Sequence, residues 1–435
     1  MDKILYLPTR YFPAISGAEF YMQRMAETLT FKYKMKAEIF TSDGIDFKSL
    51  RETEGKRITR DNKYFSQVNK LRVNRFPIDY SHSLKDKVKE IEKIPEYKKL
   101  EIPQNSLVLY LKNGPFSISL INHFLNNQNL RFDLIHTTFY PYFNLISGLI
   151  IGILTKTPTI CTPFFHFSNP RYLNSELQMT LKKFDKIIAC TKLEKKNLIK
   201  LLEIPERNID VIPMGVDYKK FSDKIKQNKN SFSFKENFFK SGEKKFKMVL
   251  FCGYKNFEKG AISILKAIPL ITKRLKSIYF VFIGPSTKAF NRELSKLQKK
   301  TRMRIINFTP DNLTGYYDKK KIAAFKETDV YLMPSRSDAF GIAFLEAWAA
   351  KKAVIGANIG ATPEVIRDNV DGLLVEFDNP DEISEKVIYL LKKKNIRRKL
   401  GAQGQNKVIK SYTWEHVADK TVALYKELIQ QCEIR

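Results

Sequence analysis

Short runs of β-branched and aromatic residues alternate with segments of helical period along most of the chain. In the first half, runs that predict strands cover residues 3–8, 37–41, 70–76, 132–137, 158–162, 185–190 and 209–213. Several of them are continuously apolar, which is typical of strands buried on both faces of a parallel sheet. Helical patterns lie between them, for example at residues 18–30, 143–154 and 192–202.

The alternation lapses over residues 218–245, which are dominated by Lys, Asn, Ser and Phe, and it restarts at residue 246. The second half predicts strands at residues 246–252, 277–283, 304–308, 330–334 and 353–357, and helices at residues 261–275, 292–300, 342–350 and 382–391. Two such series predict an α/β protein with two Rossmann-like, doubly wound parallel-sheet domains. We place the domains at residues 1–217 and 246–415, with residues 218–245 as the linker region. Two such domains facing each other would form one ligand-binding cleft.

The composition excludes a disordered chain and raises the question of anionic partners. Hydrophobic residues make up 43% of the 435 residues, which is ample for packed cores. The 76 Lys and Arg residues against 46 Asp and Glu give a formal charge of +30. This excess would suit an anionic membrane surface, an anionic substrate or a nucleic acid, and solvated helix faces are an equal alternative. The basic residues do not interleave with aromatics as in RNP-like or OB-like modules, so no nucleic acid is expected.

The cysteines and the apolar stretches predict a cytoplasmic protein whose only membrane contact would be peripheral, on the inner face of the membrane. The four cysteines are far apart and form no C-x-x-C pair, which argues against a zinc site or a disulfide framework. The N-terminus runs into a short strand without a signal-peptide pattern. The longest apolar stretch, residues 134–154, is interrupted by polar residues and a proline, so it predicts a strand followed by a buried helix.

Two predicted strand-to-helix turns carry residues suited to anions. In the first half, Gly17 opens a helix, where a glycine allows close approach and the helix N–H groups favour an anion; a plain turn glycine is an equal alternative. In the second half, Lys255 and Lys259 lie between Gly253 and Gly260 in the turn after the first strand. Such lysines can hold a diphosphate. The alternative is that they are ordinary lysines on an exposed loop.

The densest set of candidate residues follows the predicted strand at residues 330–334. Asp338 lies in the loop before a helix, and Glu346 lies about 1.5 turns inside that helix. The N–H groups of residues 340–342 lie where the helix dipole is positive. Carboxylates placed here would accept hydrogen bonds from the vicinal hydroxyls of a sugar or ribose. The alternative is that Asp338 only caps the helix and Glu346 is solvated.

These pieces together resemble glycosyltransferase family 4, whose members are retaining enzymes with the GT-B fold. The matching pieces follow the order of that family almost from end to end: the Gly17 loop, the strands ending at His136 and His166, the segment Val211-Ile212-Pro213-Met214-Gly215-Val216-Asp217, the phosphate loop from Gly253 to Gly260, the acidic element from Asp338 to Glu346, and Tyr412-Thr413-Trp414-Glu415 before the terminal helix.

The resemblance implies a role for each domain and for individual residues. The first domain would bind the acceptor, with the terminal helix at about residues 416–435 packing back on it, and the second would bind a nucleotide-sugar donor. Glu346 would hold the ribose hydroxyls, Asp338 would contact the transferred sugar, Lys259 would bind the departing diphosphate, and His166 would lie at the reacting face of the sugar. The implied catalytic residues are His166, Lys259 and Asp338, and the implied donor-binding residues are Gly17, Gly253, Lys255, Lys259, Asn307, Phe308, Asp338, Phe340, Gly341, Ile342 and Glu346.

Three positions depart from the pattern of the family. Asp338 stands in place of the usual glutamate, and Ala18 stands where a second glycine is common. Tyr254 occupies the arginine position of the phosphate loop, and the adjacent Lys255 is expected to compensate as a point charge, without the bidentate fork of arginine.

The expected reaction is transfer of a sugar to a lipid-linked or glycan acceptor, with retention of configuration and without a metal ion or other cofactor. Lysines and helix N–H groups can neutralise the charge that develops on a diphosphate, and no Asp-x-Asp motif occurs in the chain. A nucleotide-sugar hydrolase or epimerase on the same fold, a catalytically inactive sugar-nucleotide-binding protein and a basic nucleic-acid-binding protein are the alternatives. The histidine at position 136 is more simply explained as a core residue than as a catalytic one.

Overall fold

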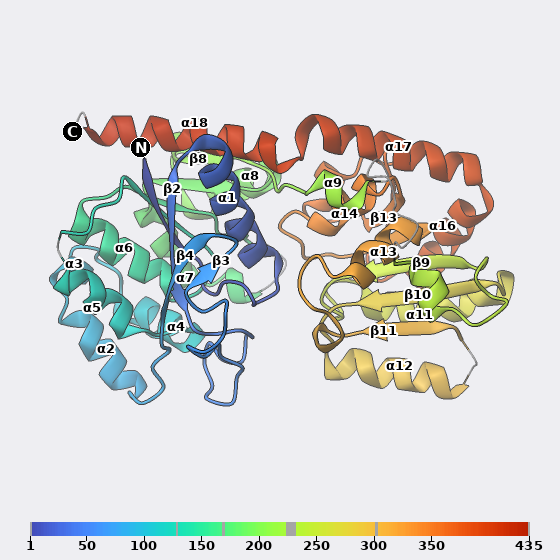
Figure 1. Cartoon of the computed structure of the whole chain (residues 1–435), viewed down its shortest axis with the longest axis horizontal. Helices are drawn as coiled ribbons and strands as arrows, with labels where there is room; N and C mark the ends of the chain where they lie inside the picture. The colour runs from blue at the N-terminus through green and yellow to red at the C-terminus, as the bar shows by residue number, and fades with distance from the viewer. Residues whose placement is uncertain (1, 128, 168–169, 223–231, 301–302, 434–435) are drawn as a thin grey trace. The chain divides into compact units, whose positions relative to one another are not determined.

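The computed structural model describes residues 2–127, 129–167, 170–222, 232–300 and 303–433. The chain divides into two compact units (Figure 1). Unit 1 comprises residues 1–213 and 414–435, and unit 2 comprises residues 214–413. Each unit has its own sheet, so the prediction of two doubly wound α/β domains is confirmed.

Unit 1 is built on an eight-stranded sheet in the order β3-β4-β2-β1-β5-β6-β7-β8. All neighbours pair in parallel except the short β3, which is antiparallel to β4. Every residue of β5 and β7 is buried, as expected for strands covered on both faces. The strands are β1 (Lys3–Leu7), β2 (Lys36–Ser42), β3 (Gln67–Val68), β4 (Leu71–Phe76), β5 (Leu134–Thr137), β6 (Thr159–Cys161), β7 (Lys186–Ala189) and β8 (Ile209–Val211).

Helices cover the sheet of unit 1. The longest apolar stretch of the sequence forms β5 and then the buried helix α6, as predicted. None of the helices that the structure describes is long and apolar enough to cross a membrane. The helices are α1 (Gly17–Tyr33), α2 (Leu84–Glu92), α3 (Pro95–Lys98), α4 (Gln104–Asn113), α5 (Ile118–Asn126), α6 (Asn144–Thr155), α7 (Ser175–Gln178), α8 (Lys192–Leu202) and α18 (Trp414–Glu433), with 3₁₀ turns at Pro170–Tyr172, Met179–Lys183 and Glu206–Asn208.

The terminal helix α18 belongs to unit 1, where it covers a buried histidine. The ring of His136 contacts the Tyr425 hydroxyl through Nδ1, and its Nε2 lies 2.8 Å from Oγ1 of Thr162. Burial lowers the pKa of His136 to about 3, so the ring is neutral at physiological pH. His136 is therefore a hydrogen-bonded core residue.

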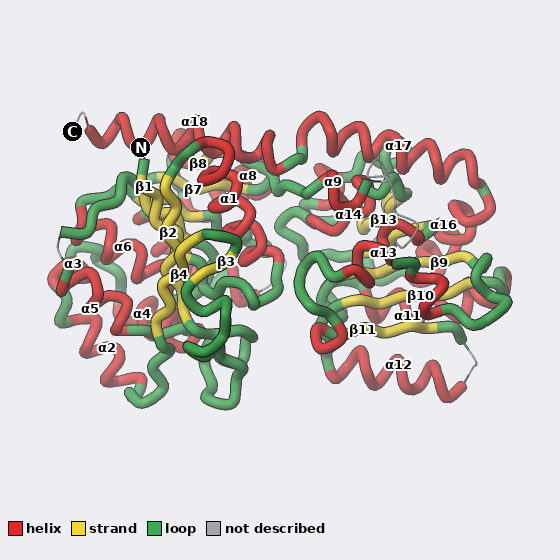
Figure 2. The backbone as a smooth tube through the Cα atoms, viewed as in Figure 1, coloured by secondary structure: helices red, strands yellow, loops and turns green. Residues whose placement is uncertain are grey.

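Unit 2 is built on a six-stranded sheet, parallel throughout, in the order β11-β10-β9-β12-β13-β14. The neighbours β9, β10 and β11 are visible side by side in Figure 2. The sequence missed β14, which is only three residues long. The strands are β9 (Lys247–Cys252), β10 (Ile278–Ile283), β11 (Ile305–Phe308), β12 (Val330–Met333), β13 (Ala353–Ala357) and β14 (Leu373–Val375).

The helices of unit 2 include two that the sequence did not predict, α13 and α17, whose mean hydropathy is low because both are rich in lysine and arginine. The helices are α9 (Tyr218–Phe221), α10 (Phe234–Phe238), α11 (Ala261–Arg274), α12 (Lys288–Lys300), α13 (Lys319–Glu327), α14 (Ile342–Ala349), α15 (Thr362–Val365), α16 (Pro380–Lys392) and α17 (Lys394–Ser411), with a 3₁₀ turn at Pro310–Asn312.

The prediction of a linker at residues 218–245 is corrected by the structure. The described residues of this segment are part of unit 2 rather than a connection between domains. Phe221 of α9 is fully buried, and its ring lies 5.5 Å from the ring of Phe325. Phe234 of α10 is also fully buried. The aromatic residues of this polar segment therefore anchor it to the core, although they follow no regular period. Residues 223–231 of the predicted linker lie outside the described residues.

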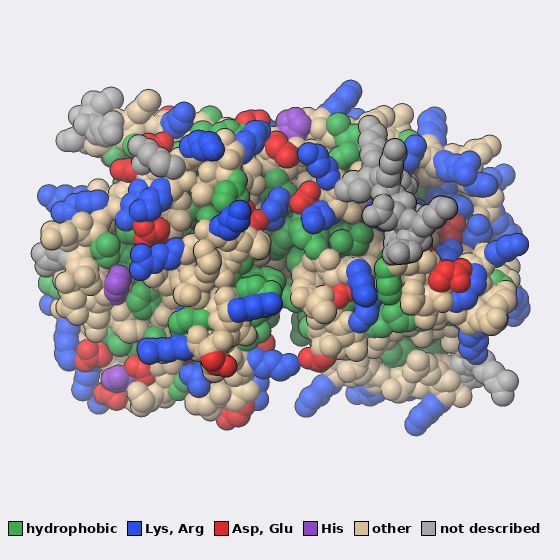
Figure 3. All heavy atoms as spheres, in the orientation of Figure 1, with side chains coloured by type: hydrophobic (Ala, Val, Ile, Leu, Met, Phe, Trp, Pro, Cys, Tyr) green, Lys and Arg blue, Asp and Glu red, His purple; other side chains and the backbone are tan. Residues whose placement is uncertain are grey.

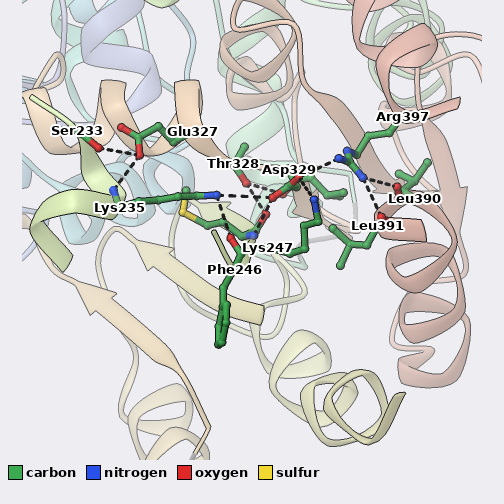
Figure 4. Close-up of polar contacts among 12 residues, drawn as sticks. Ser233, Lys235, Phe246, Lys247, Glu327, Thr328, Asp329, Leu390, Leu391 and Arg397 are labelled. Carbon is green, nitrogen blue, oxygen red and sulfur yellow. Dashed lines mark hydrogen bonds and ion pairs between the residues drawn. The ribbon is translucent and has the colours of Figure 1, made fainter. Parts of the chain in front are cut away.

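A polar network centred on Asp329 joins the amino ends of β9 and β12 to the helices around them (Figure 4). Oδ2 of Asp329 accepts a hydrogen bond of 3.0 Å from the N–H of Met248, and Oδ1 lies 2.9 Å from Nη2 of Arg397. Nη1 of Arg397 in turn donates to the carbonyl of Leu390 at the end of α16 (2.8 Å). This edge of the sheet lies opposite the edge formed by the carboxyl ends of the strands, where α/β sheets bind their ligands. We therefore assign the network to stability.

Replacing Asp329 with asparagine is expected to lower the free energy of unfolding by about 2 kcal/mol. The change leaves the largely buried guanidinium of Arg397 without its carboxylate, and an unpaired buried charge is costly. Urea denaturation of the variant and the wild type measures the loss. Asp381→Asn, on the exposed first turn of α16, is the matched control, and an equal effect of both changes would contradict the assignment.

Candidate functional site

The candidate site of unit 2 lies at the carboxyl ends of β9 and β12. Residues 253–260 connect β9 to α11, and residues 334–341 connect β12 to α14. The two strands are paired in parallel, so both connections leave the same edge of the sheet. Pairing of the strands thus brings together two segments that are about 80 residues apart in the sequence.

Two glycines let these connections approach each other. Gly260 has a φ of 73°, and a Cβ at this position would lie 2.2 Å from the carbonyl oxygen of Pro334. Gly341 has a φ of 92° and precedes the first residue of α14, Ile342. Phe340 is buried, with its ring 5.6 Å from that of Tyr412. The N–H groups of residues 340–342 lie at the start of α14, where a helix provides no acceptor of its own and can bind an anion or a sugar oxygen.

Lys259 and Asp338 form an ion pair in this site. Nζ of Lys259 donates to Oδ1 of Asp338 and to the carbonyl oxygen of Ser337, the latter over 2.6 Å. The side chains are 19% and 12% exposed, respectively. The second carboxylate oxygen of Asp338 is buried and has no hydrogen-bond partner among the described residues. The structure thus brings together two of the predicted catalytic residues, and it gives Asp338 a role beyond capping the helix.

Glu346 forms a second ion pair, with a lysine that the sequence did not identify. Nζ of Lys321 lies 2.8 Å from Oε1 of Glu346, and the side chains are only 7% and 2% exposed. Glu346 is therefore buried, which contradicts the alternative of a solvated helix face. Lys321 was missed because α13 was not predicted. It shares the buried face of that helix with Ala324 and Phe325. A lysine at helical spacing from two apolar residues was the pattern in the sequence that could have identified it.

Lys255 lies deeper in unit 2 than the sequence predicted. Its side chain is fully buried, with Nζ 2.5 Å from Oδ1 of Asn307 and 2.9 Å from the carbonyl oxygen of Phe308. The ammonium group is thus held by groups at the end of β11, and its expected contact with phosphates stays a prediction. Tyr254, at the arginine position, is 47% exposed. Lys255 instead joins the turn after Gly253 to the end of β11.

Burial lowers the pKa of Lys255 from 10.5 to about 8, because a buried ammonium group loses its hydration. In the unfolded chain the lysine keeps its proton up to the ordinary value. Between pH 8 and 10.5 the unfolded state therefore binds more protons than the folded state, and stability rises with pH.

We expect the free energy of unfolding of the wild type, relative to Lys255→Met, to rise by about 1–2 kcal/mol between pH 7 and 9.5. Urea denaturation at several pH values measures this difference. Lys273→Met, on the exposed end of α11, is the control, for which no such trend is expected. A difference that stays flat for Lys255→Met would contradict the assigned burial of a charged ammonium group.

The predicted residues of the first domain lie at the start of α1 and in the loop after β6 of unit 1. Gly17 is the first residue of α1, which follows β1, and His166 lies in the loop after β6 with its ring 5.1 Å from that of Tyr172. A buried ion pair that the sequence did not predict joins Arg10, in the loop before Gly17, to Glu19 in the first turn of α1 at 2.7 Å. The predicted contacts of Gly17 and His166 with a donor or acceptor stay predictions.

The described residues contain no group of three or more His, Cys, Asp and Glu side chains that could hold a metal ion. Whether the reaction needs a metal is a separate question, and metal independence stays a prediction.

Comparisons with known proteins agree with the resemblance found in the sequence. The family model described as "Glycosyl transferases group 1" matches residues 233–407, and the model described as "Glycosyltransferase Family 4" matches residues 82–220. The two matches together support a glycosyltransferase similar to family 4, as the motifs predicted. It is 26% identical over 367 residues to an uncharacterized glycosyltransferase of Methanocaldococcus jannaschii, which covers 78% of this chain and 88% of the relative.

A second relative and a solved structure extend the comparison. The chain is 26% identical over 349 residues to a phosphatidyl-myo-inositol mannosyltransferase of Mycobacterium tuberculosis, covering 77% of this chain and 84% of the relative. The crystal structure of HepE from Anabaena, in complex with UDP and glucose, covers 98% of this chain and 100% of that one, with a TM-score of 0.70 and 13% identity. The fold class is thus that of the GT-B glycosyltransferases.

Proposed function

We propose that this chain is a retaining hexosyltransferase that moves a sugar from a nucleotide-sugar donor to a lipid-linked or glycan acceptor, without a metal ion. The observation that carries the proposal is the meeting of Lys259 and Asp338 at the start of α14, with Glu346 further along the same helix. One edge of one sheet thus offers a cation, two carboxylates and the N–H groups at the start of a helix. These are the groups that a diphosphate, a sugar and a ribose require.

The reaction follows from this arrangement. When the bond between the anomeric carbon and the diphosphate breaks, positive charge develops on the sugar and negative charge on the diphosphate. Lys259 and the N–H groups of residues 340–342 would stabilise the diphosphate, and Asp338 would bind hydroxyls of the sugar. The acceptor hydroxyl would attack on the face that the diphosphate leaves, which retains the configuration. Its oxygen would form the new bond to the anomeric carbon, and its proton would pass to an oxygen of the departing diphosphate. No carboxylate nucleophile is assigned.

Two comparisons support the choice of substrates. The HepE structure holds UDP and glucose, which supports a nucleotide-sugar donor and makes UDP-sugars the first donors to test. The name of the mycobacterial relative includes a lipid acceptor, phosphatidyl-myo-inositol. Lys and Arg side chains are spread over the visible face in Figure 3, and the formal charge is +30, which suits an acceptor held at an anionic membrane surface inside the cell. In this proposal unit 1 binds the acceptor, with Gly17 and His166 at the reacting groups.

The test is a panel of nucleotide sugars analysed by mass spectrometry, with and without lipid-phosphate and glycan acceptors, in the presence of EDTA and of added Mg²⁺. The expected result is a glycosylated acceptor and release of nucleoside diphosphate only when an acceptor is present. Release without an acceptor would indicate a hydrolase instead, and a donor converted to an isomer would indicate an epimerase. The anomeric configuration of the product, read by NMR, tests retention.

A further inference from the structure

We propose that Lys321 is a positioning residue for the nucleotide site: it keeps the buried carboxylate of Glu346 ionised and oriented to accept hydroxyl groups of the donor. The inference rests on the proposed function, because it assigns to Glu346 the ribose of a nucleotide sugar. Lys321 itself would not touch the donor. Its ammonium group lies 2.8 Å from Oε1 of Glu346, and the lysine side chain is almost fully buried.

The surroundings of Glu346 explain why this lysine is needed. Cys252 at the end of β9, Tyr316 in the loop before α13 and Tyr331 of β12 face Glu346, and all three are neutral at physiological pH because burial raises their pKa values, that of Cys252 to about 12. Within the described part of the chain, Lys321 is the only cation that forms an ion pair with Glu346. Without it, the carboxylate would be a buried charge with no counter-ion.

The geometry also fixes the direction of the carboxylate. An ammonium group is only a donor, so Oε1 must turn toward Lys321, and the ring of Tyr316 lies 3.6 Å from the same Nζ and restricts it further. A carboxylate has about four acceptor positions, so one oxygen can bind Lys321 while positions remain for two hydroxyls.

Removing the ammonium group has a consequence that a loss of packing would not have. A buried carboxyl group without a counter-ion favours its protonated form, which has lost acceptor capacity. In Lys321→Met, nucleotide affinity should therefore fall as the pH falls. In the wild type, the trend expected is the one caused by titration of the nucleotide and of Lys255, whose pKa is about 8, and the variant shares it. The ratio of the two affinities cancels that trend.

The experiment is calorimetric titration of the full chain with UDP, GDP and ADP at pH 6, 7 and 8. For Lys321→Met, the ratio of its Kd to that of the wild type is expected to increase about tenfold from pH 8 to pH 6. Lys321→Arg should restore a constant ratio near one. Lys319→Met, which removes the same charge from an exposed position of α13, is the matched control and should also give a constant ratio.

Two further variants keep the test decisive. Lys321→Gln retains a donor but no charge, so it should show the same pH trend if Lys321→Met fails to fold. The double variant K321M/E346Q has no titrating carboxyl group, and its affinity ratio should not change with pH. A ratio that is constant for every folded, uncharged variant at position 321 would overturn the role of Lys321. The two failures are distinguishable. A constant affinity ratio counts against Lys321 alone, whereas a wild type that binds none of the three nucleotides counts against the proposed function.

Discussion

Replacing Glu346 with alanine is expected to weaken the binding of a nucleoside diphosphate by about a hundredfold or more. The change removes the acceptor of two hydroxyl hydrogen bonds in the proposed site, and a hydrogen bond to a charged group contributes about 1.5–3 kcal/mol. It also leaves Lys321 as a buried cation without its partner. Calorimetry with the nucleotide that binds the wild type best measures the loss.

The control separates loss of the site from loss of the fold. Glu385→Ala removes a glutamate from an exposed position of α16 and should leave the affinity unchanged. The double variant E346A/K321M removes the unpaired cation as well, so it should recover thermal stability but not affinity. An unchanged affinity in both Glu346 variants would remove Glu346 from the donor site.

Lys259→Met is expected to lower kcat by about a thousandfold with a much smaller change in KM. Negative charge on the diphosphate is greatest in the transition state, so a cation placed there stabilises the transition state more than the bound donor, and removal of such a group costs about 10²–10³ in rate. Steady-state kinetics with the donor and acceptor found in the panel measure both constants.

The ion pair complicates this prediction and supplies its control. Loss of Lys259 leaves Asp338 without its cation, so part of the effect could come from a disturbed carboxylate. K259M/D338N removes both charges and should still have a kcat about a thousandfold below that of the wild type if Lys259 acts on the leaving group. Lys273→Met should retain full activity. A single Lys259→Met variant with unaltered kcat would exclude Lys259 from the mechanism.

Much of the fold could be predicted because its signals are local. Several strands of both sheets are continuous apolar runs, and residues 134–154 were correctly predicted as a strand and a buried helix. Some of the failures were elements without such a signal: α13 and α17 are rich in basic residues, and β14 is too short for its apolar character to stand out. The linker was wrong for a related reason, since isolated buried aromatics in a polar segment have no period to recognise.

By itself, the sequence determined the two α/β series, the glycine turns that lead into α11 and α14, and the candidate residues Lys259, Asp338 and Glu346, because each depends on neighbours along the chain. Only the tertiary structure decided which side chains meet. Lys259 pairs with Asp338 across 79 positions and Lys321 pairs with Glu346 across 25, while Lys255 is buried and hydrogen-bonds Asn307. The physical reason is that ion pairing and burial depend on distances set by strand order and helix packing, which no local pattern encodes.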